Sequence, residues 1–235
     1  MSNPFHFKQF TVQQENAPFK VGTDGVLIGS WAKCTETNGS ILDIGTGTGL
    51  ISLMLAQRFP SCKITAIEIN SDAASQAKSN FEASPWKDRI QLIHSKFQEC
   101  EFPNQFDLIV CNPPFFSNSQ KGEQYGKNLA RHEVELNLND LIFNSKRLLQ
   151  EKGNLSLVIP FDRLKELEQL VAVNKLNITR KCEVSPKPST PPKRVLLEIS
   201  KKQSNLKSSS LVLELERHKY SVEYNRLTKD FYLKG

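Results

Sequence analysis

From residue 40 onward the chain alternates short β-branched runs with longer helical patterns, and this alternation constrains the fold more than any other feature of the sequence. Most of the runs are nearly continuous in apolar residues, as expected for strands buried on both faces. The predicted strands are 41–44, 63–69, 90–94, 106–111 and 154–159. Strands and helices in this order predict a parallel sheet wrapped by helices.

Helical periodicity fills the intervals between these strands. Apolar residues recur at helical spacing over 50–57, and a second helix is predicted to begin at Ser71 as its capping residue. A third helix is predicted over 138–149, closed by Gly153.

The pattern changes after Pro160. We predict a helix, a strand, a proline-rich connection and a second strand over 163–173, 177–184, 185–193 and 194–199. The short connection favours an antiparallel pair, because a parallel crossover needs a dozen or more residues. Residues 201–210 are polar and are expected to be mobile, whereas 211–235 returns to apolar alternation.

Composition is that of an ordinary globular protein, with 38% apolar and 24% charged residues among 235. This length predicts one domain. The five cysteines are odd in number and widely spaced, which favours reduced thiols and no structural zinc. No run of about 18 apolar residues occurs, so we expect a cytoplasmic protein without a membrane segment.

A glycine-rich loop, DIGTGTG, follows the first predicted strand and precedes a helical pattern. Gly45, Gly47 and Gly49 permit a tight turn and let the backbone approach a ligand closely. The spacing differs from the dinucleotide fingerprint, and Asp43 would repel a phosphate there. No Lys-Ser/Thr pair follows the glycines, so a nucleotide-binding P-loop is excluded.

An acidic residue stands at the end of the second predicted strand, where a carboxylate can accept both hydroxyl hydrogens of a ribose. This residue is Glu68, 19 positions after Gly49. Asp43 is suited to a ligand that carries a cationic amine. A nucleoside with a cationic amino-acid tail and no phosphate meets both requirements, which predicts S-adenosylmethionine as the cofactor. The alternative is that the glycines only form a close turn between strand and helix.

The third predicted strand ends next to Ser95 and Lys96. The Ser95 side chain and the Lys96 backbone are placed to meet the amine of the cofactor adenine. The alternative is that Ser95 is an ordinary residue at a strand end.

The fourth predicted strand runs into Asn112, Pro113, Pro114 and Phe115. Ligands of open α/β sheets bind outside the carboxyl ends of the strands. The prolines fix the backbone and leave rigid carbonyl acceptors beside the Asn112 amide. We predict that the Asn112 side-chain oxygen and the Pro113 carbonyl bind the two hydrogens of a substrate amino group, while Phe115 stacks on a planar group. The alternative is a plain turn.

Basic residues gather in the carboxyl-terminal part, where residues 181–207 hold seven basic and two acidic side chains. Lys193 and Arg194 belong to this group and are predicted to bind RNA phosphates. The polar loop 117–133 carries Lys121 and Arg131, which we also expect to contact substrate. The alternatives are a solvated charged face and a plain surface loop.

The glycine loop, Glu68 and the segment from Asn112 to Phe115 resemble the signature motifs of class I S-adenosylmethionine-dependent amino-methyltransferases. More narrowly, the chain resembles the bacterial tRNA1(Val) (adenine-37-N6)-methyltransferase family over essentially its full length. The segments that carry this resemblance are FHFKQF, KVGTDG, SPW, ARH, PKRVLL and LTKDFYL.

The resemblance implies a Rossmann-like α/β fold with a seven-stranded mixed sheet in the order 3-2-1-4-5-7-6, helices on both faces and an antiparallel carboxyl-terminal hairpin. It implies that Thr23 and Asp24 help to enclose the methionine end of the cofactor. We divide the single domain into a cofactor-covering segment, a cofactor-binding and catalytic core, and a hairpin with the basic segment, over 1–35, 36–160 and 161–235.

The resulting functional hypothesis is N6-methylation of an adenine in tRNA, most specifically adenine 37 of tRNA1(Val), by a monomer that needs no metal. Three alternatives stay open at this point. They are a guanine-N2 methyltransferase acting on rRNA, a glutamine-N5 methyltransferase acting on protein, and an RNA-binding module without catalysis.

Overall fold

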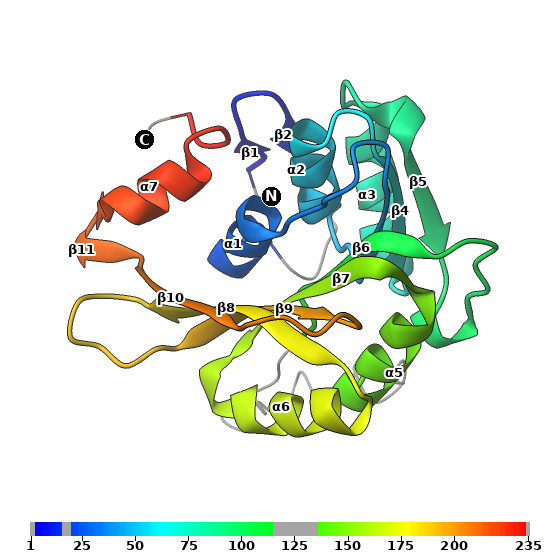
Figure 1. Ribbon diagram of the computed structural model, residues 1–235. Coiled ribbons are helices and arrows are strands. Elements are labelled where there is room, and N and C mark those ends of the chain that lie inside the picture. The colour runs from blue at the N-terminus through cyan, green and yellow to red at the C-terminus, as the bar shows by residue number, and fades with distance from the viewer. Residues whose placement is uncertain (1–2, 16–19, 115–135, 234–235) are drawn as a thin grey trace, which may run out of the picture.

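An eight-stranded sheet forms the centre of the computed structural model, which describes residues 3–15, 20–114 and 136–233 (Figure 1). Its strands are β3 (Ser40–Ile44), β4 (Lys63–Glu68), β5 (Ile90–His94), β6 (Phe106–Cys111), β7 (Leu149–Pro160), β8 (Asn177–Ser185), β9 (Arg194–Ser200) and β10 (Lys207–Val212). Their order across the sheet is β10-β8-β9-β7-β6-β3-β4-β5.

The first seven of these strands, from β3 to β9, confirm the expected order 3-2-1-4-5-7-6. The five neighbouring strands β5, β4, β3, β6 and β7 are parallel to one another. Strand β9 is antiparallel to both of its neighbours, β7 and β8. The predicted carboxyl-terminal hairpin is therefore confirmed. Parallel β-α-β connections bring the carboxyl ends of β3 to β7 to one edge of the sheet.

The eighth strand, β10, was not predicted. It pairs in parallel with β8 from Lys207 to Val212, so the expectation that residues 201–210 are mobile is wrong for 207–210. Residues 207–210 are exposed and mostly serine, because β10 is an edge strand that packs little onto the core. An exposed edge strand of this kind gives no hydrophobic alternation in the sequence.

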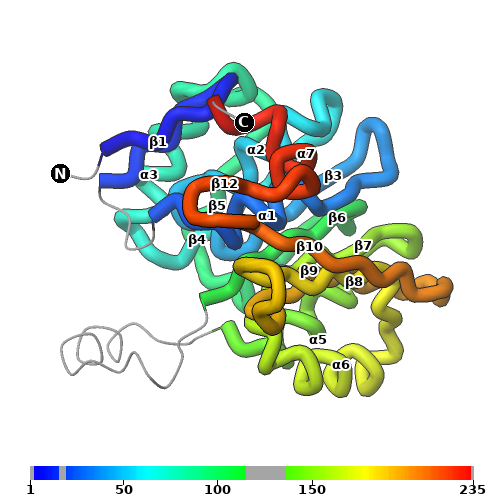
Figure 2. Tube along the Cα trace, turned by 90° about the vertical axis from the view of Figure 1, so that its left-hand side faces the viewer, coloured from blue at the N-terminus to red at the C-terminus, as the bar shows by residue number. Residues whose placement is uncertain are grey.

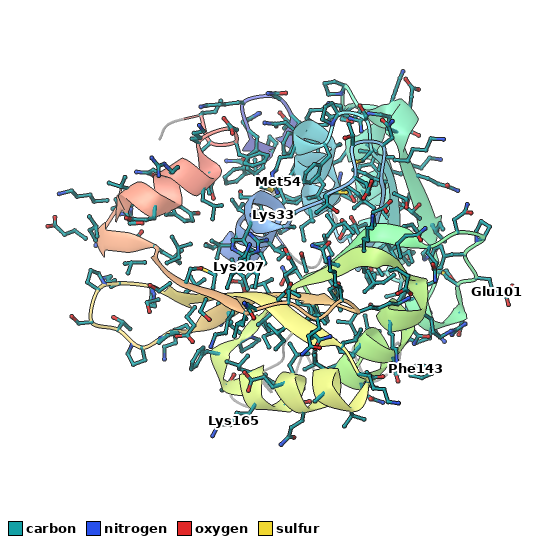
Figure 3. All side chains as sticks on the ribbon, viewed as in Figure 1. Lys33, Met54, Glu101, Phe143, Lys165 and Lys207 are labelled. Atoms are coloured by element: carbon teal, nitrogen blue, oxygen red, sulfur yellow. The ribbon has the colours of Figure 1, made fainter. Side chains whose placement is uncertain are left out.

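Helices cover both faces of the sheet (Figure 1). They are α1 (Thr23–Trp31), α2 (Leu50–Arg58), α3 (Ser71–Glu82), α5 (Leu138–Leu148), α6 (Leu164–Val173) and α7 (Val222–Thr228). Adjacent strand residues such as Ile41 and Leu42 point to opposite faces and belong to two separate apolar clusters. The first cluster holds residues of α1, α2, α3 and α7, among them Met54 between α2 and α1 (Figure 3). The second cluster holds residues of α5 and α6.

Two predicted helix boundaries differ from the structure. Asn70, not Ser71, caps α3, because its side chain accepts a hydrogen bond from the Ala73 backbone N–H at 2.9 Å. Gly153 lies inside β7 and does not close α5, since the chain passes from Leu148 directly into a strand that pairs with β6.

The amino-terminal hairpin joins β1 (Phe5–His6) to β2 (Thr11–Val12) and packs against the carboxyl-terminal part of the chain (Figure 2). Phe7 forms an isolated antiparallel bridge with Tyr232, and the Lys8 backbone N–H donates to the Phe231 carbonyl at 2.8 Å. Phe7 also stacks on the Tyr232 ring at a centroid distance of 6.0 Å. A second small sheet, β11 (Glu214–Glu216) with β12 (Lys219–Tyr220), precedes α7.

Candidate active site

Strand register places the main predicted site residues in one row. Ile44 at the end of β3 is aligned with the penultimate residue of β4 on one side and the last residue of β6 on the other. The next position is Gly45 after β3, Glu68 at the end of β4 and Asn112 after β6. All three lie at the carboxyl edge of the sheet. Neighbouring strands are about 4.8 Å apart, so the Glu68 and Asn112 backbones lie about 10 Å from each other.

The three loop glycines have positive φ angles but different surroundings. Their φ values are +68° for Gly45, +57° for Gly47 and +86° for Gly49. A Cβ atom on Gly45 or Gly47 would meet no heavy atom within 4 Å, whereas on Gly49 it would lie 2.4 Å from the Phe81 ring. The first two glycines thus leave open space beside the loop, and the third allows α2 to begin close to α3.

Asp43 is fully buried beneath this loop. Its Oδ2 atom accepts hydrogen bonds from the Thr46 hydroxyl at 2.6 Å and the Ser52 hydroxyl at 2.7 Å. Its Oδ1 atom is buried and has no hydrogen-bond partner in the described part of the chain. Burial raises the pKa of Asp43 to about 6, although the hydrogen bonds from Thr46 and Ser52 lower it. A carboxylate with one unpartnered oxygen fits a ligand that carries a cationic amine.

Glu68 is nearly buried and is held by two backbone donors. The Gly47 N–H donates to Oε2 at 2.8 Å, and the Asn70 N–H donates to Oε1 at 2.9 Å. The carboxylate therefore connects the end of β4 to the glycine loop. The next residue, Ile69, is 44% exposed, so an apolar surface adjoins the carboxylate. The sequence reasoning missed Ile69, whose position after Glu68 was the available signal.

Ser95 and Lys96 lie beside Glu68 at the same edge. The Ser95 N–H donates to the Glu68 carbonyl at 3.0 Å, and its hydroxyl lies 3.4 Å from the Lys96 carbonyl. The Lys96 ammonium forms an ion pair with Glu99 at 3.0 Å. The structure thus joins the Ser95 backbone to that of Glu68, and the predicted contact of Ser95 and Lys96 with the cofactor adenine stays a prediction.

Asn112, Pro113 and Pro114 leave β6 at this edge, on the other side of β3 from Glu68. Asn112 is partly exposed, Pro113 is buried and Pro114 is exposed. Phe115 lies outside the described residues, as do Lys121 and Arg131 of the predicted substrate loop. Asn112 is therefore partly exposed at the carboxyl edge of the sheet, and its contact with a substrate amino group stays a prediction.

The first turn of α1 reaches the same edge through an ion pair. The Arg194 Nε atom donates to Asp24 Oδ2 at 2.7 Å, and both side chains are partly exposed. Arg194 is aligned with Pro160 at the end of β7, and the Lys193 carbonyl accepts from the Phe161 N–H. Thr23 is exposed beside Asp24. Thr23, Asp24, Lys193 and Arg194 are thus gathered near the carboxyl ends of the parallel strands.

The other basic residues of 181–207 do not share this position. Lys201 follows the opposite end of β9, where its ammonium donates to the Leu149 carbonyl at 2.8 Å and pairs with Glu151 at 3.1 Å. Lys181 pairs with Glu183 at 3.0 Å, and Lys207 begins the edge strand β10 (Figure 3). The segment that is basic in sequence is therefore divided between both ends of its strands, and only part of it adjoins the predicted site.

Three further features concern the surface, metal ligands and helix length. A groove of about 490 Å³ lies between α5 and α6 and contains none of the predicted site residues. Within 3–15, 20–114 and 136–233, no three histidine, cysteine or acidic side chains are grouped to bind a metal ion. In the same ranges, no helix has the length and apolarity that a bilayer crossing requires.

The sheet order, the glycine loop and the acidic residues at the ends of β3 and β4, Asp43 and Glu68, define the class I S-adenosylmethionine-dependent methyltransferase fold. An Agrobacterium tumefaciens protein described as a predicted O-methyltransferase has this fold, with a TM-score of 0.69, 18% identity, and coverage of 88% of this chain and 96% of that chain. A glycopeptide N-methyltransferase complexed with (S)-adenosyl-L-methionine gives a TM-score of 0.57 at 11% identity, covering 79% of this chain and 90% of the other.

The methyltransferase small domain model matches residues 25–174. A tRNA1(Val) (adenine(37)-N6)-methyltransferase of Parabacteroides distasonis is 48% identical over 239 residues, which cover 100% of both chains. The chain therefore belongs to the methyltransferase small domain family and to the tRNA1(Val) (adenine(37)-N6)-methyltransferase family. The resemblance predicted from its motifs is confirmed.

Proposed function

We propose that this chain transfers a methyl group from S-adenosylmethionine to N6 of an adenine in tRNA, specifically adenine 37 of tRNA1(Val). The observation that carries the proposal is the single row of Glu68, Gly45 and Asn112 at the carboxyl edge of the sheet. The row supports the proposal because a carboxylate, a glycine loop and a partly exposed Asn112 at one sheet edge would be within reach of one bound nucleoside. The full-length relative at 48% identity supports the choice of substrate.

The residues around the row fit the cofactor. Glu68 would bind the ribose hydroxyls, the unpartnered Oδ1 atom of Asp43 would bind the amine, and the open space at Gly45 and Gly47 would admit the chain between them. Thr23, Asp24, Ser95 and Lys96 would line the two ends, and Ile69 would pack against the adenine face. S-adenosylmethionine, when bound, supplies an electrophilic methyl group and leaves as a neutral thioether.

Asn112 orients the nucleophile in this proposal. Its side-chain oxygen accepts one hydrogen of the adenine amino group, and the Pro113 carbonyl accepts the other, so that the nitrogen lone pair points toward the methyl group. Pro114 keeps this segment rigid, and Phe115 stacks on the base. Alignment of two bound reactants accounts for about 7–11 kcal/mol of barrier lowering. A strong general base is not needed, because the alkylated amino group is acidic and loses its proton to solvent.

The RNA would reach the site from the side of Lys193, which is exposed next to the end of β7. Lys121, Arg131 and the free face of the Arg194 guanidinium would contact phosphates, with the target base flipped out of its stack. We extend the proposal to a cytoplasmic monomer without a metal ion. Residues 1–35 would cover the cofactor, 36–160 would form the core of the single domain, and 161–235 would supply the hairpin and basic segment.

The experiment is incubation of the purified chain with methyl-labelled cofactor and total bacterial RNA, followed by nucleoside analysis. Labelled N6-methyladenosine in the tRNA fraction is the expected result. Labelled N2-methylguanosine in rRNA would indicate the guanine-N2 alternative. Label in a glutamine-containing protein substrate would indicate the protein methyltransferase, and RNA binding without any incorporation would indicate a non-catalytic module.

A further inference from the structure

A buried asparagine joins the glycine loop to the amino-terminal segment. Asn80 lies in α3 and is 2% exposed. Its Nδ2 atom donates to the Thr48 carbonyl at 2.8 Å, between two of the loop glycines, and to the Gln13 carbonyl at 2.9 Å. Its Oδ1 atom accepts from the Gln13 N–H at 2.9 Å. One side chain therefore binds both segments at once.

The Asn80 side-chain amide forms hydrogen bonds with both the N–H and the carbonyl of Gln13. This paired arrangement is the same as that of a hydrogen-bonded residue pair in an antiparallel sheet. The amide group uses both of its donor hydrogens and its oxygen in these bonds. A buried amide with every function satisfied fixes the relative position of the groups that it joins. Asn80 thus sets the distance between the segment at Gln13 and the loop.

Further hydrogen bonds lead from Gln13 to the beginning of α1, and we call this series, from Asn80 to Val21, the polar path. The Gln14 side-chain oxygen accepts from the Val21 N–H at 2.8 Å, and its Nε2 atom donates to the Asn3 carbonyl at 2.9 Å. The Lys20 ammonium contacts the Gln14 carbonyl. Val21 precedes Thr23 by two residues, so the path ends at the predicted contacts for the methionine end of the cofactor.

We infer that Asn80 is a positioning residue that holds the amino-terminal segment against the glycine loop and thereby sets the affinity for the cofactor. This inference rests on the proposed function, since it assumes that the loop and Thr23 border one cofactor. Asn80 does not contact the reacting atoms in this account. Its loss lets Gln13 and the start of α1 move away from the loop, so that the bound nucleoside dissociates faster.

The test compares Asn80→Ala with Asn154→Ala by calorimetric titration with S-adenosylhomocysteine in the absence of RNA. Asn154 is a matched control, because it is also nearly buried and its Nδ2 atom donates to the Lys33 carbonyl at 3.1 Å, outside the path described above. We expect Kd to rise at least about tenfold for Asn80→Ala and to stay within about twofold for Asn154→Ala. With cofactor and tRNA both saturating, kcat should be unchanged, because the chemical groups are intact.

Hydrogen exchange of the ligand-free proteins separates positioning from general destabilisation. In Asn80→Ala, faster exchange should be confined to residues 11–14 and 46–49. Uniformly faster exchange over the whole chain would overturn the inference and leave a merely structural role. An unchanged Kd for S-adenosylhomocysteine would overturn it as well.

A second pair of variants tests the same contact without altering the buried site. Gln13→Pro removes the N–H that donates to Asn80, removes the exposed side chain and fixes the backbone φ angle, whereas Gln13→Ala removes the side chain alone and keeps the backbone pair. The proline variant should bind S-adenosylhomocysteine more weakly than the alanine variant, and equal affinities would contradict the inference. A wild-type chain that binds this ligand but methylates no tRNA would overturn the proposed function alone. A wild-type chain that does not bind it would overturn both.

Discussion

Arg194 and Asp24 form an ion pair of 2.7 Å although 170 residues separate them in the chain. The pair joins the first residue of β9 to the first turn of α1, and the Arg194 Nη1 atom also donates to the Lys193 carbonyl. The guanidinium therefore connects the proposed cofactor contacts at Asp24 with the proposed RNA contact at Lys193. We predicted that Arg194 binds RNA. Its ion pair with Asp24 shows that it also holds β9 next to α1.

The strength of this pair can be measured by a double-mutant cycle with Arg194→Ala and Asp24→Asn. Both side chains are partly exposed, so solvent screens the interaction and we expect a coupling free energy of about 0.2–1 kcal/mol in urea unfolding. The coupling should shrink in 1 M NaCl, where the Debye length is about 3 Å. A coupling of zero at low salt would show that the pair does not stabilise the protein.

The ligand-free protein should lose stability as the pH rises through about 6. Because the pKa of Asp43 is about 6 when folded and 3.8 ordinarily, the folded chain retains a proton that the unfolded chain has released. The contribution is fully present below about 3.8, is lost as the pH rises through about 6, and amounts to about 3 kcal/mol at most. Urea unfolding at pH 5 and pH 8 should therefore show a smaller pH effect in Asp43→Asn than in the wild type. Equal pH effects in the two proteins would contradict this role.

Cofactor binding should have the opposite pH dependence. The proposed contact needs ionised Asp43 to attract the amine, so affinity for S-adenosylhomocysteine should fall between pH 7 and pH 5. Asp43→Asn should bind weakly at both values. Titrations at the two pH values check this result. If the wild-type affinity does not change, Asp43 does not bind the ligand amine.

The loop glycines should respond differently to alanine. Both Gly47 and Gly49 have positive φ, which costs a residue with a Cβ atom about 1–2 kcal/mol. Gly49→Ala also collides with Phe81, so it should lower thermal stability far more than Gly47→Ala. Gly47→Ala should instead lower cofactor affinity, because its methyl group enters the open space. Equal loss of stability in the two variants would contradict the difference in their surroundings.

Asn112→Ala should strongly slow methyl transfer without preventing cofactor binding. Removal of one oriented hydrogen-bonding group at a reacting centre commonly lowers kcat by about 100-fold or more. We expect such a decrease in single-turnover assays, with the Kd for S-adenosylhomocysteine within a few-fold of the wild type. An equal decrease in affinity and rate would make Asn112 a structural residue.

Charge reversal at the two ends of β9 tests the proposed RNA edge. Lys193 and Lys202 are both exposed, but only Lys193 adjoins the end of β7. Lys193→Glu should weaken tRNA binding and lower the salt slope by about 0.7–0.9 for each lost phosphate contact. Lys202→Glu is the matched control and should change neither quantity. Similar losses in both variants would indicate nonspecific electrostatics.

The sequence predicted the sheet because its central strands are buried on both faces, so runs such as 41–44 and 106–111 are apolar except for one aspartate each. It predicted the positions of Gly45, Glu68 and Asn112 because residues that follow parallel strands meet at one edge. The hydrogen bonds of Asp43 with Thr46 and Ser52 were not predicted, although these partners lie only three and nine residues further on.

Other features depend on contacts that leave no periodic signal. The helix α7 has seven residues and buries only Tyr224 and Thr228, so its sequence does not show a helical face. The pairing of Arg194 with Asp24 requires β9 to lie next to β7, which no local pattern specifies. Asn80 gave no signal because its hydrogen-bond partners at Gln13 and Thr48 are backbone atoms, which are the same for nearly every residue type.

The bridge between Phe7 and Tyr232 has a consequence for synthesis on the ribosome. Residues 7 and 8 are synthesised before the central strands, yet the Phe231 carbonyl that accepts from Lys8 is made more than 220 residues later. A nascent chain can therefore assemble the central strands before Tyr232, the partner of Phe7, has been synthesised. Docking of the amino-terminal hairpin must wait until the carboxyl-terminal segment has left the exit tunnel.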